Sequence, residues 1–168
     1  MKIYVASSWR NPYQQEIVAL IRGCGHEVYD FRNPHATGPD RGRRGIGFAW
    51  REIDPAWQSW SPDQFREALK HPVARDGFDS DADALAWCDL CVLVLPCGRS
   101  SHLEAGWAKG AGKKLVIIQF ENCEPELMYS WADAIVTSAC EAGSLFLHAH
   151  KLFGAPRRTA VAKEQARQ

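Results

Sequence analysis

Near its middle the chain reads Leu90-Cys91-Val92-Leu93-Val94-Leu95, an unbroken apolar run that ends at Pro96-Cys97-Gly98. A short apolar run that is bounded by turn residues is typical of a strand buried on both faces. Strands of that kind lie inside parallel sheets whose two faces are covered by helices. The run therefore predicts the central strand of an α/β domain.

Strands and helices alternate on both sides of this central strand. Upstream, residues 2–6 form an apolar strand, a helix begins near Pro12 and ends at Gly23, and residues 27–31 form a second strand. A right-handed crossover makes such a β-α-β unit parallel. Further helices are predicted over residues 61–70, 79–87, 101–110, 125–131 and 141–153, and further strands over residues 114–120 and 134–137.

This alternation predicts the fold class, a three-layer α/β/α domain with a doubly wound, mostly parallel five-stranded sheet of the flavodoxin or Rossmann kind. We assign residues 1–154 to this single domain and expect residues 155–168, which are polar and aperiodic, to form a flexible tail. Residues 32–60 break any period, so we expect a long loop and interpret it as a lid. Such sheets bind ligands beyond the carboxyl ends of their strands.

The composition argues against several functional classes. With 168 residues, 46% of them hydrophobic, the chain can bury a core without metals or disulfides. Its 20 basic and 20 acidic side chains cancel, which argues against binding a nucleic acid polymer. The apolar start is too short for a signal peptide or a membrane span, so we expect a cytoplasmic protein that binds no membrane. Because Cys88-x-x-Cys91 lacks a second ligand pair, we predict neither a metal site nor a cofactor, and we expect a small-molecule ligand.

The turn after the central strand is the first candidate for a functional site. The sequence has neither a Gly-x-Gly-x-x-Gly nor a Gly-x-x-x-x-Gly-Lys-Ser/Thr loop, which disfavours ordinary dinucleotide binding and P-loop hydrolysis. Instead, the start of the following helix offers backbone and side-chain donors for a phosphate or a sugar, from Gly98, Arg99, Ser100 and Ser101. Glu104 follows one turn later. Because Ser101-x-x-Glu104 is also a capping-box pattern, its spacing leaves a structural and a functional role of Glu104 equally open.

Polar residues also follow the first strand, beside the central one, and should border the same crevice. These residues are Ser7, Ser8, Trp9 and Arg10. Their plainer interpretation is that polar residues end a strand, and the sequence leaves both interpretations open. Aromatic side chains in loops either anchor the loop to the core or form a flat wall for a ligand. Trp9 and Trp50 are therefore candidates for stacking on a base.

Four pieces of the sequence are informative through their order and spacing. They are Lys2-Ile3-Tyr4-Val5-Ala6-Ser7-Ser8, the aspartate-bearing residues 79–83, Cys88-Asp89-Leu90-Cys91-Val92-Leu93-Val94, and Glu104-Ala105-Gly106-Trp107-Ala108 ahead of Gly112-Lys113-Lys114. Together they resemble the nucleoside 2-deoxyribosyltransferase-like family, which includes nucleotide N-glycosidases. The resemblance spans roughly residues 1 to 120.

The resemblance implies that Glu104 is a nucleophile toward the anomeric carbon, and that an aspartate on the preceding helix donates a proton to the leaving base. Asp81 matches that position best, with Asp79 and Asp83 beside it; spacing alone favours a plainer role for all three, as acids in the first turn of a helix. Breaking an N-glycosidic bond requires one ionised carboxylate and one protonated acid, which fits this division. The family also forms homo-oligomers, so the resemblance implies a homodimer or a higher homo-oligomer.

Three functions stay open at the level of sequence. The first is cleavage or transfer of the N-glycosidic bond of a (deoxy)nucleoside or nucleotide, the second is a non-catalytic sensor of a nucleotide derivative, and the third is NAD glycohydrolysis. Ser100-Ser101-His102-Leu103 replaces the acidic residue and the Gly-Thr pair that the transferases usually carry. The two serines and Arg99 would suit a 5′-phosphate, because a guanidinium matches phosphate oxygens. The sequence does not distinguish a nucleoside from a nucleotide.

Overall fold

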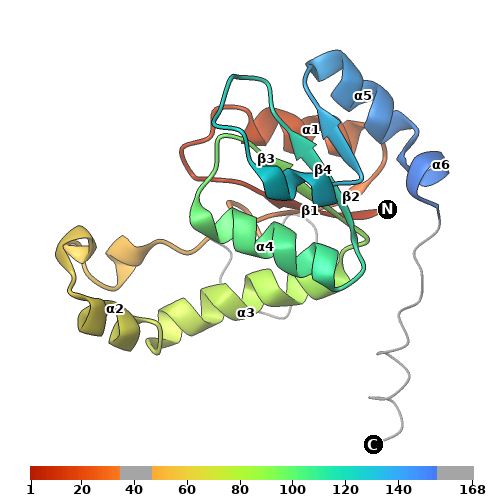
Figure 1. The fold of residues 1–168 in the computed structure, drawn as a ribbon. Coiled ribbons are helices and arrows are strands. Elements are labelled where there is room, and N and C mark those ends of the chain that lie inside the picture. Colours follow the sequence, from red (N-terminus) through yellow and green to blue (C-terminus); the bar gives the residue numbers. More distant parts are fainter. Residues whose placement is uncertain (35–46, 155–168) are drawn as a thin grey trace, which may run out of the picture.

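Five parallel strands form one sheet in the order β2-β1-β3-β4-β5 (Figure 1). The computed structural model describes residues 1–34 and 47–154 of the chain. The strands are β1 (Lys2–Ala6), β2 (Glu27–Asp30), β3 (Leu90–Val94), β4 (Lys114–Ile118) and β5 (Ala134–Val136). All four pairings are parallel, which confirms the predicted doubly wound fold class.

Helices cover both faces of the sheet, so the domain has three layers (Figure 1). The α-helices are α1 (Gln14–Gly23), α2 (Pro62–Ala68), α3 (Pro72–Trp87), α4 (Arg99–Gly110), α5 (Ala139–Leu147) and α6 (Ala149–Phe153), and the short 3-10 helices are η1 (Trp50–Glu52), η2 (Trp57–Ser59) and η3 (Leu127–Trp131). One core layer joins α1 and α5 to the sheet, and the other joins α3 and α4 to it. Within the described residues, no helix is long and apolar enough to cross a membrane.

The central strand β3 explains why the sheet needs both layers. All five of its residues are buried, as the apolar run predicts. Strand β3 pairs with β1 on one side and β4 on the other, so the chain proceeds outward in opposite directions from the β1–β3 pair. In open α/β sheets a ligand crevice forms where the strand order reverses in this way.

Two predicted helix starts are wrong in ways that matter for the candidate site. Helix α3 begins at Pro72 and not at residue 79, because Pro72 takes the first helical position and the ring of His71 accepts a hydrogen bond from the Val73 backbone N–H (3.2 Å). Helix α4 begins at Arg99 and not at residue 101, with Gly98 as its N-cap. Farther along, the predicted helix over 125–131 is the 3-10 helix η3, and the predicted helix over 141–153 is divided into α5 and α6.

The predicted loop over residues 32–60 contains regular structure in its described part. Residues 35–46 of that loop and the predicted tail, residues 155–168, lie outside the described residues. The described part of the loop contains η1 and η2. An aromatic cluster of Phe48, Trp50, Trp60 and Phe65 joins these two helices to α2 through edge-on contacts, with ring centroids 4.7–5.7 Å apart. Phe48 packs directly on Gly77 of α3, where an added Cβ would lie 2.7 Å from the Phe48 Cβ. The loop is therefore anchored to the helix that carries Asp81.

Replacing Gly77 with alanine should release this anchor. The new methyl group would overlap Phe48, and overpacking of this kind costs about 1–3 kcal/mol of the free energy of unfolding. Gly106→Ala in α4 is the matched control: no atom lies within 4 Å of its Cβ position, so the better helix propensity of alanine should raise stability by about 0.5–1 kcal/mol. Urea unfolding measures both values, and equal stabilisation by the two substitutions would contradict the packing of Phe48 on α3.

Candidate active site

Glu104 lies in the second turn of α4, on the side of the helix that carries the buried Ala105 and Ala108 toward the sheet. The hydroxyl of Ser100 donates a hydrogen bond to its Oε1 (3.2 Å). The capping-box interpretation of Glu104 is wrong, because the N-cap is Gly98 and Glu104 lies beyond the unpaired amides of the first turn. Ser101 does not cap the helix either: its hydroxyl donates to the backbone carbonyl of Ser7 (2.8 Å).

Asp81 lies in the middle of α3 and is joined to the sheet by a hydrogen bond. The hydroxyl of Tyr29, on β2, donates to Asp81 Oδ1 (2.8 Å), and the same hydroxyl lies 3.0 Å from the Oγ of Ser80. The interpretation of the aspartates as first-turn acids is wrong, because α3 begins at Pro72. Asp79 and Asp83 are each two positions from Asp81, and residues with that spacing do not share a helix face.

Tyr4 and Tyr29 join the two acids into one cluster. Tyr4 is opposite Tyr29 in the β1–β2 register, and their rings stack with centroids 5.3 Å apart. Burial raises the pKa of Tyr4 well above its usual value, and the charges of Asp81 and Glu104 raise it further. Two carboxyl groups and two phenols therefore interact on the sheet face that α3 and α4 cover.

The environment of this cluster raises the pKa of both carboxyl groups. Burial raises the pKa of Glu104 to about 7, with a further increase from the charge of Asp81, while the hydroxyls of Ser100 and Tyr4 oppose the shift. Burial also raises the pKa of Asp81 to about 6, against the opposing hydrogen bond from Tyr29. Strongly shifted acids that interact with one another are typical of active sites. Between about pH 6 and pH 7 the pair therefore retains about one proton.

A buried hydrogen-bond network fastens the turn after β1 to the turn after β3. Ser7 is buried, and its hydroxyl donates to the Val94 carbonyl (2.9 Å). The side-chain amide of Asn11, which the sequence analysis did not single out, donates to the same carbonyl (3.0 Å) and to that of Pro96 (2.9 Å). The only sequence feature that pointed to Asn11 is its place in the polar segment that follows the apolar strand β1. Ser7 and Ser101 thus link two backbone turns through their hydroxyl groups.

The other predicted residues after β1 lie at the surface. Ser8 is partly buried, and Arg10 is exposed. Trp9 is 50% exposed and packs edge-on against Phe31, with ring centroids 5.4 Å apart. The guanidinium of Arg32 donates to the backbone carbonyls of Ser8, Trp9 and Asn11 (2.8–3.1 Å) and lies 5.8 Å from the Trp9 ring centroid. The Trp9 ring is therefore fixed in place while half of its surface is open.

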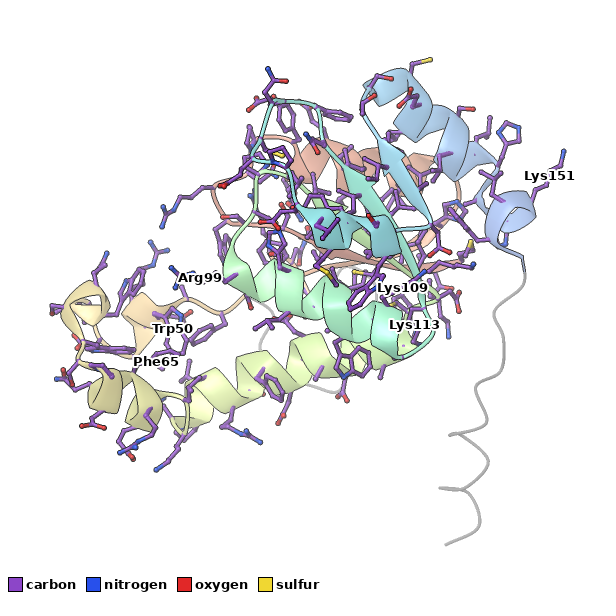
Figure 2. All side chains as sticks on the ribbon, in the orientation of Figure 1. Trp50, Phe65, Arg99, Lys109, Lys113 and Lys151 are labelled. Atoms are coloured by element: carbon purple, nitrogen blue, oxygen red, sulfur yellow. The ribbon has the colours of Figure 1, made fainter. Side chains whose placement is uncertain are left out.

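Trp50 and Arg99 come from different elements, η1 and the N-terminal end of α4. Trp50 packs with Phe65 beside α2, whereas Arg99 projects from the N-terminal end of α4 (Figure 2). Gly98, Arg99 and Ser100 are exposed there. His102 also belongs to this end of α4, where its ring bonds to the Gly98 carbonyl (2.9 Å) and to the Tyr129 hydroxyl (2.8 Å). Among the described residues, no hydrogen bond or ring contact joins Trp50 to the acid pair, so its predicted base contact stays a prediction.

No metal site is found within residues 1–34 and 47–154: these residues contain no group of three or more histidine, cysteine or acidic side chains arranged to bind an ion. Cys88 and Cys91 are buried thiols. Burial raises the pKa of the Cys88 thiol to about 12, which keeps the thiol protonated and unsuited to binding a metal. What the described site offers chemically is a pair of carboxyl groups and their hydroxyl donors.

Fold and site together define an α/β domain with a carboxyl pair between its sheet and two helices. Among solved structures, the chain is similar to a 2-deoxyribosyltransferase from the psychrotolerant bacterium Bacillus psychrosaccharolyticus, with a TM-score of 0.52 and 17% sequence identity over 85% of this chain and 90% of that one. It also aligns with a CMP N-glycosidase from Clostridium botulinum, with a TM-score of 0.43 and 17% identity over 86% of this chain and 96% of that one. No family model and no curated protein matches the chain. The predicted resemblance is thus confirmed at the level of the fold.

Replacing Glu104 with glutamine should stabilise the protein at high pH. The folded pKa of Glu104 lies above its unfolded value, so folding retains a proton that the unfolded chain loses, and stability falls as pH rises from about 4.5 to about 7. Glutamine cannot ionise, so the variant should unfold on the order of 10 °C above the wild type at pH 8 and close to it at pH 4. Thermal unfolding followed by circular dichroism measures both. An equal change at the two pH values would show that Glu104 ionises normally.

Proposed function

We propose that this protein cleaves or transfers the N-glycosidic bond of a (deoxy)nucleoside or nucleotide through a glycosyl intermediate on Glu104. The observation that carries the proposal is the pairing of Glu104 with Asp81, two partly buried acids of raised pKa on neighbouring helices. The fold shared with a 2-deoxyribosyltransferase supports the same class of reaction. At 17% sequence identity, the roles proposed here are assigned from the side chains of this chain itself.

The reaction uses the two carboxyl groups in turn. The Glu104 carboxylate attacks the anomeric carbon and forms an ester bond to the sugar, while the C–N bond breaks and its electron pair passes to the base nitrogen. Asp81 donates its proton to that nitrogen and becomes a carboxylate. In the second half, Asp81 takes a proton from water or from an acceptor base, which attacks the same carbon and releases Glu104. Retaining glycosidases divide the chemistry between two carboxyl groups in this way.

The proton of the pair has to be on Asp81 at the moment of attack. In the free protein, burial raises the pKa of both acids and the charge of Asp81 raises that of Glu104 further, so the two carboxyl groups share a proton before substrate binds. A base nitrogen that accepts a hydrogen bond from Asp81 favours the protonated form of Asp81. Glu104 then becomes the ionised partner, stabilised by the Ser100 hydroxyl. Substrate binding itself thus prepares the nucleophile.

Residues around the pair supply candidate contacts for the rest of the substrate. The open face of Trp9 suits stacking on the base, because its ring is already held by Phe31 and Arg32. The exposed donors of Gly98, Arg99 and Ser100 suit sugar hydroxyls or a 5′-phosphate. We infer that Ser7 and Ser101 contribute by joining the two turns on which these contacts depend. A homo-oligomer, expected from the resemblance, would add a partner chain to this site.

Substituting the two acids should separate their roles. Glu104→Ala should lower turnover at least about 1,000-fold, because the covalent route is lost, and Asp81→Asn should lower it about 100- to 10,000-fold, as expected for a general acid. The assay incubates the protein with mixed nucleosides, deoxynucleotides and NAD, and chromatography detects the free base. Glu141→Gln, on α5 at the other face of the sheet, is the control and should keep full activity.

A substrate with fluorine at C2′ tests the intermediate directly, because fluorine slows its breakdown. Mass spectrometry of the digested protein should find the sugar on Glu104. A sugar on Asp81 would reverse the two roles, and full turnover by Glu104→Ala would refute the proposal. Ligand binding in calorimetry with no base released from any substrate would identify a sensor, and nicotinamide released faster than any nucleoside base would identify an NAD glycohydrolase.

The pH dependence of activity should follow the acid pair. Catalysis needs one carboxyl group ionised and the other protonated, so kcat/KM should give a bell-shaped profile whose two limbs lie near the apparent pKa values of the pair, about 6 and about 7. In the Asp81→Asn variant, the residual kcat/KM should no longer fall at higher pH, because asparagine has no acidic proton to lose. Initial rates at low substrate concentration measure the profile. A wild-type rate that is constant from pH 5 to pH 8 would contradict the pairing.

A further inference from the structure

Tyr29 contacts the acid pair from the sheet and takes no direct part in the proposed bond-making and proton-transfer steps. It lies on β2, is only 2% exposed, and belongs to the same core layer as Tyr4. Its hydroxyl donates to Asp81 Oδ1 (2.8 Å). Within the described residues, Tyr29 is the hydrogen-bond donor to the Asp81 carboxyl group. Packing alone would require only the ring of Tyr29, so the hydrogen bond from its hydroxyl to one oxygen of a candidate acid needs a further explanation.

We propose that Tyr29 is a positioning residue that directs the acidic proton of Asp81 to Oδ2, with the Ser80 hydroxyl supporting it. This inference rests on the proposed function, in which Asp81 donates a proton to the leaving base. In this role, Tyr29 determines which oxygen of Asp81 carries the proton that is donated to the base.

The direction of the hydrogen bonds carries this inference. A phenol has one proton, and Tyr29 gives it to Asp81 Oδ1; the Ser80 hydroxyl, 3.0 Å away, must then donate to the Tyr29 oxygen. Burial and the neighbouring acids raise the pKa of Tyr29, so it stays a donor over the whole working range. Because Oδ1 already accepts this bond, the proton of neutral Asp81 is placed on Oδ2. The chain Ser80, Tyr29, Asp81 thus has a fixed direction.

The sheet holds the Tyr29 ring in one place. Its register partner is Tyr4, whose ring stacks on it at an angle of 15° between the ring planes. The other titratable groups that act on this part of the cluster are Glu104 from α4, Tyr4 from β1 and Cys91 from β3. Glu104 and Asp81 both raise the pKa of Tyr4, so the two phenols and the two acids respond to one another. Removing the Tyr29 hydroxyl would therefore change the proton equilibrium of the pair without removing a packed ring.

Tyr29→Phe tests the proposal, because it keeps the stacked ring and deletes one hydrogen bond. That bond favours the ionised form of Asp81, so its loss should raise the pKa of Asp81 and move the corresponding limb of the kcat/KM profile to higher pH. We expect kcat to fall about 10-fold with little change in KM, as for the loss of one hydrogen bond to a charged group. Ser80→Ala should give changes of the same sign but smaller. Tyr13→Phe is the matched control: it deletes a tyrosine–carboxylate bond, to Glu121, outside this cluster and should leave the profile unchanged.

A measurement without substrate separates this inference from the proposed function. Carbon-detected NMR follows the titration of the Asp81 carboxyl group in the free protein, with Asp81→Asn identifying its signal. A higher Asp81 pKa in Tyr29→Phe than in the wild type supports the positioning role even if no substrate is found. An unchanged Asp81 pKa and an unchanged pH profile, with the fold intact, would overturn it even if the N-glycosidic activity is confirmed. A loss of kcat without any pH shift would also overturn it, since it would indicate a merely structural role.

Discussion

The pairing of β1 with both β2 and β3 is the constraint on which the rest of the structure depends. It places Tyr4 opposite Tyr29 on one side and opposite Cys91 on the other, in the core layer that α3 and α4 cover. A shift of one residue in this register would send Tyr4 to the other face of the sheet. The same pairing brings the ends of β1 and β3 together, so the Ser7 and Asn11 side chains bond the Val94 carbonyl. The candidate site is thus built on the backbone of three adjacent strands.

Much of the fold could be predicted from the sequence, because the fold is dictated by apolar runs. The five strands end within two residues of their predicted positions, since burial on both faces leaves a clear signal. Helix starts were less predictable. Three aspartates at the expected spacing resembled a first turn, but Pro72 and His71 begin α3 earlier. Ser101 and Glu104 matched a capping box, but Gly98 caps α4 and the Ser101 hydroxyl turns toward the Ser7 carbonyl.

The resemblance predicted Glu104 and Asp81 as the acids of the site, yet the side chains around them could not be predicted from the sequence. Tyr4 and Tyr29 look like ordinary strand residues, because aromatic side chains are common in sheets. Their contact with the acids depends on strand order and register, which are long-range properties of the fold. Asn11 likewise lies in a loop, and its role depends on the distant carbonyls of Val94 and Pro96. A pattern that is local in sequence does not contain these pairings.

The donors around the acid pair are hydroxyl groups, and this determines what the pair can do. Ser100 and Tyr4 oppose the raised pKa of Glu104, and Tyr29 opposes that of Asp81. A lysine or arginine in their place would favour both carboxylates strongly and leave no acid at neutral pH. Hydroxyls stabilise a carboxylate without adding a positive charge, so burial can still retain one proton on the pair. Acid–base chemistry on a leaving group requires that proton, and a site designed only for binding a cation would have no use for it.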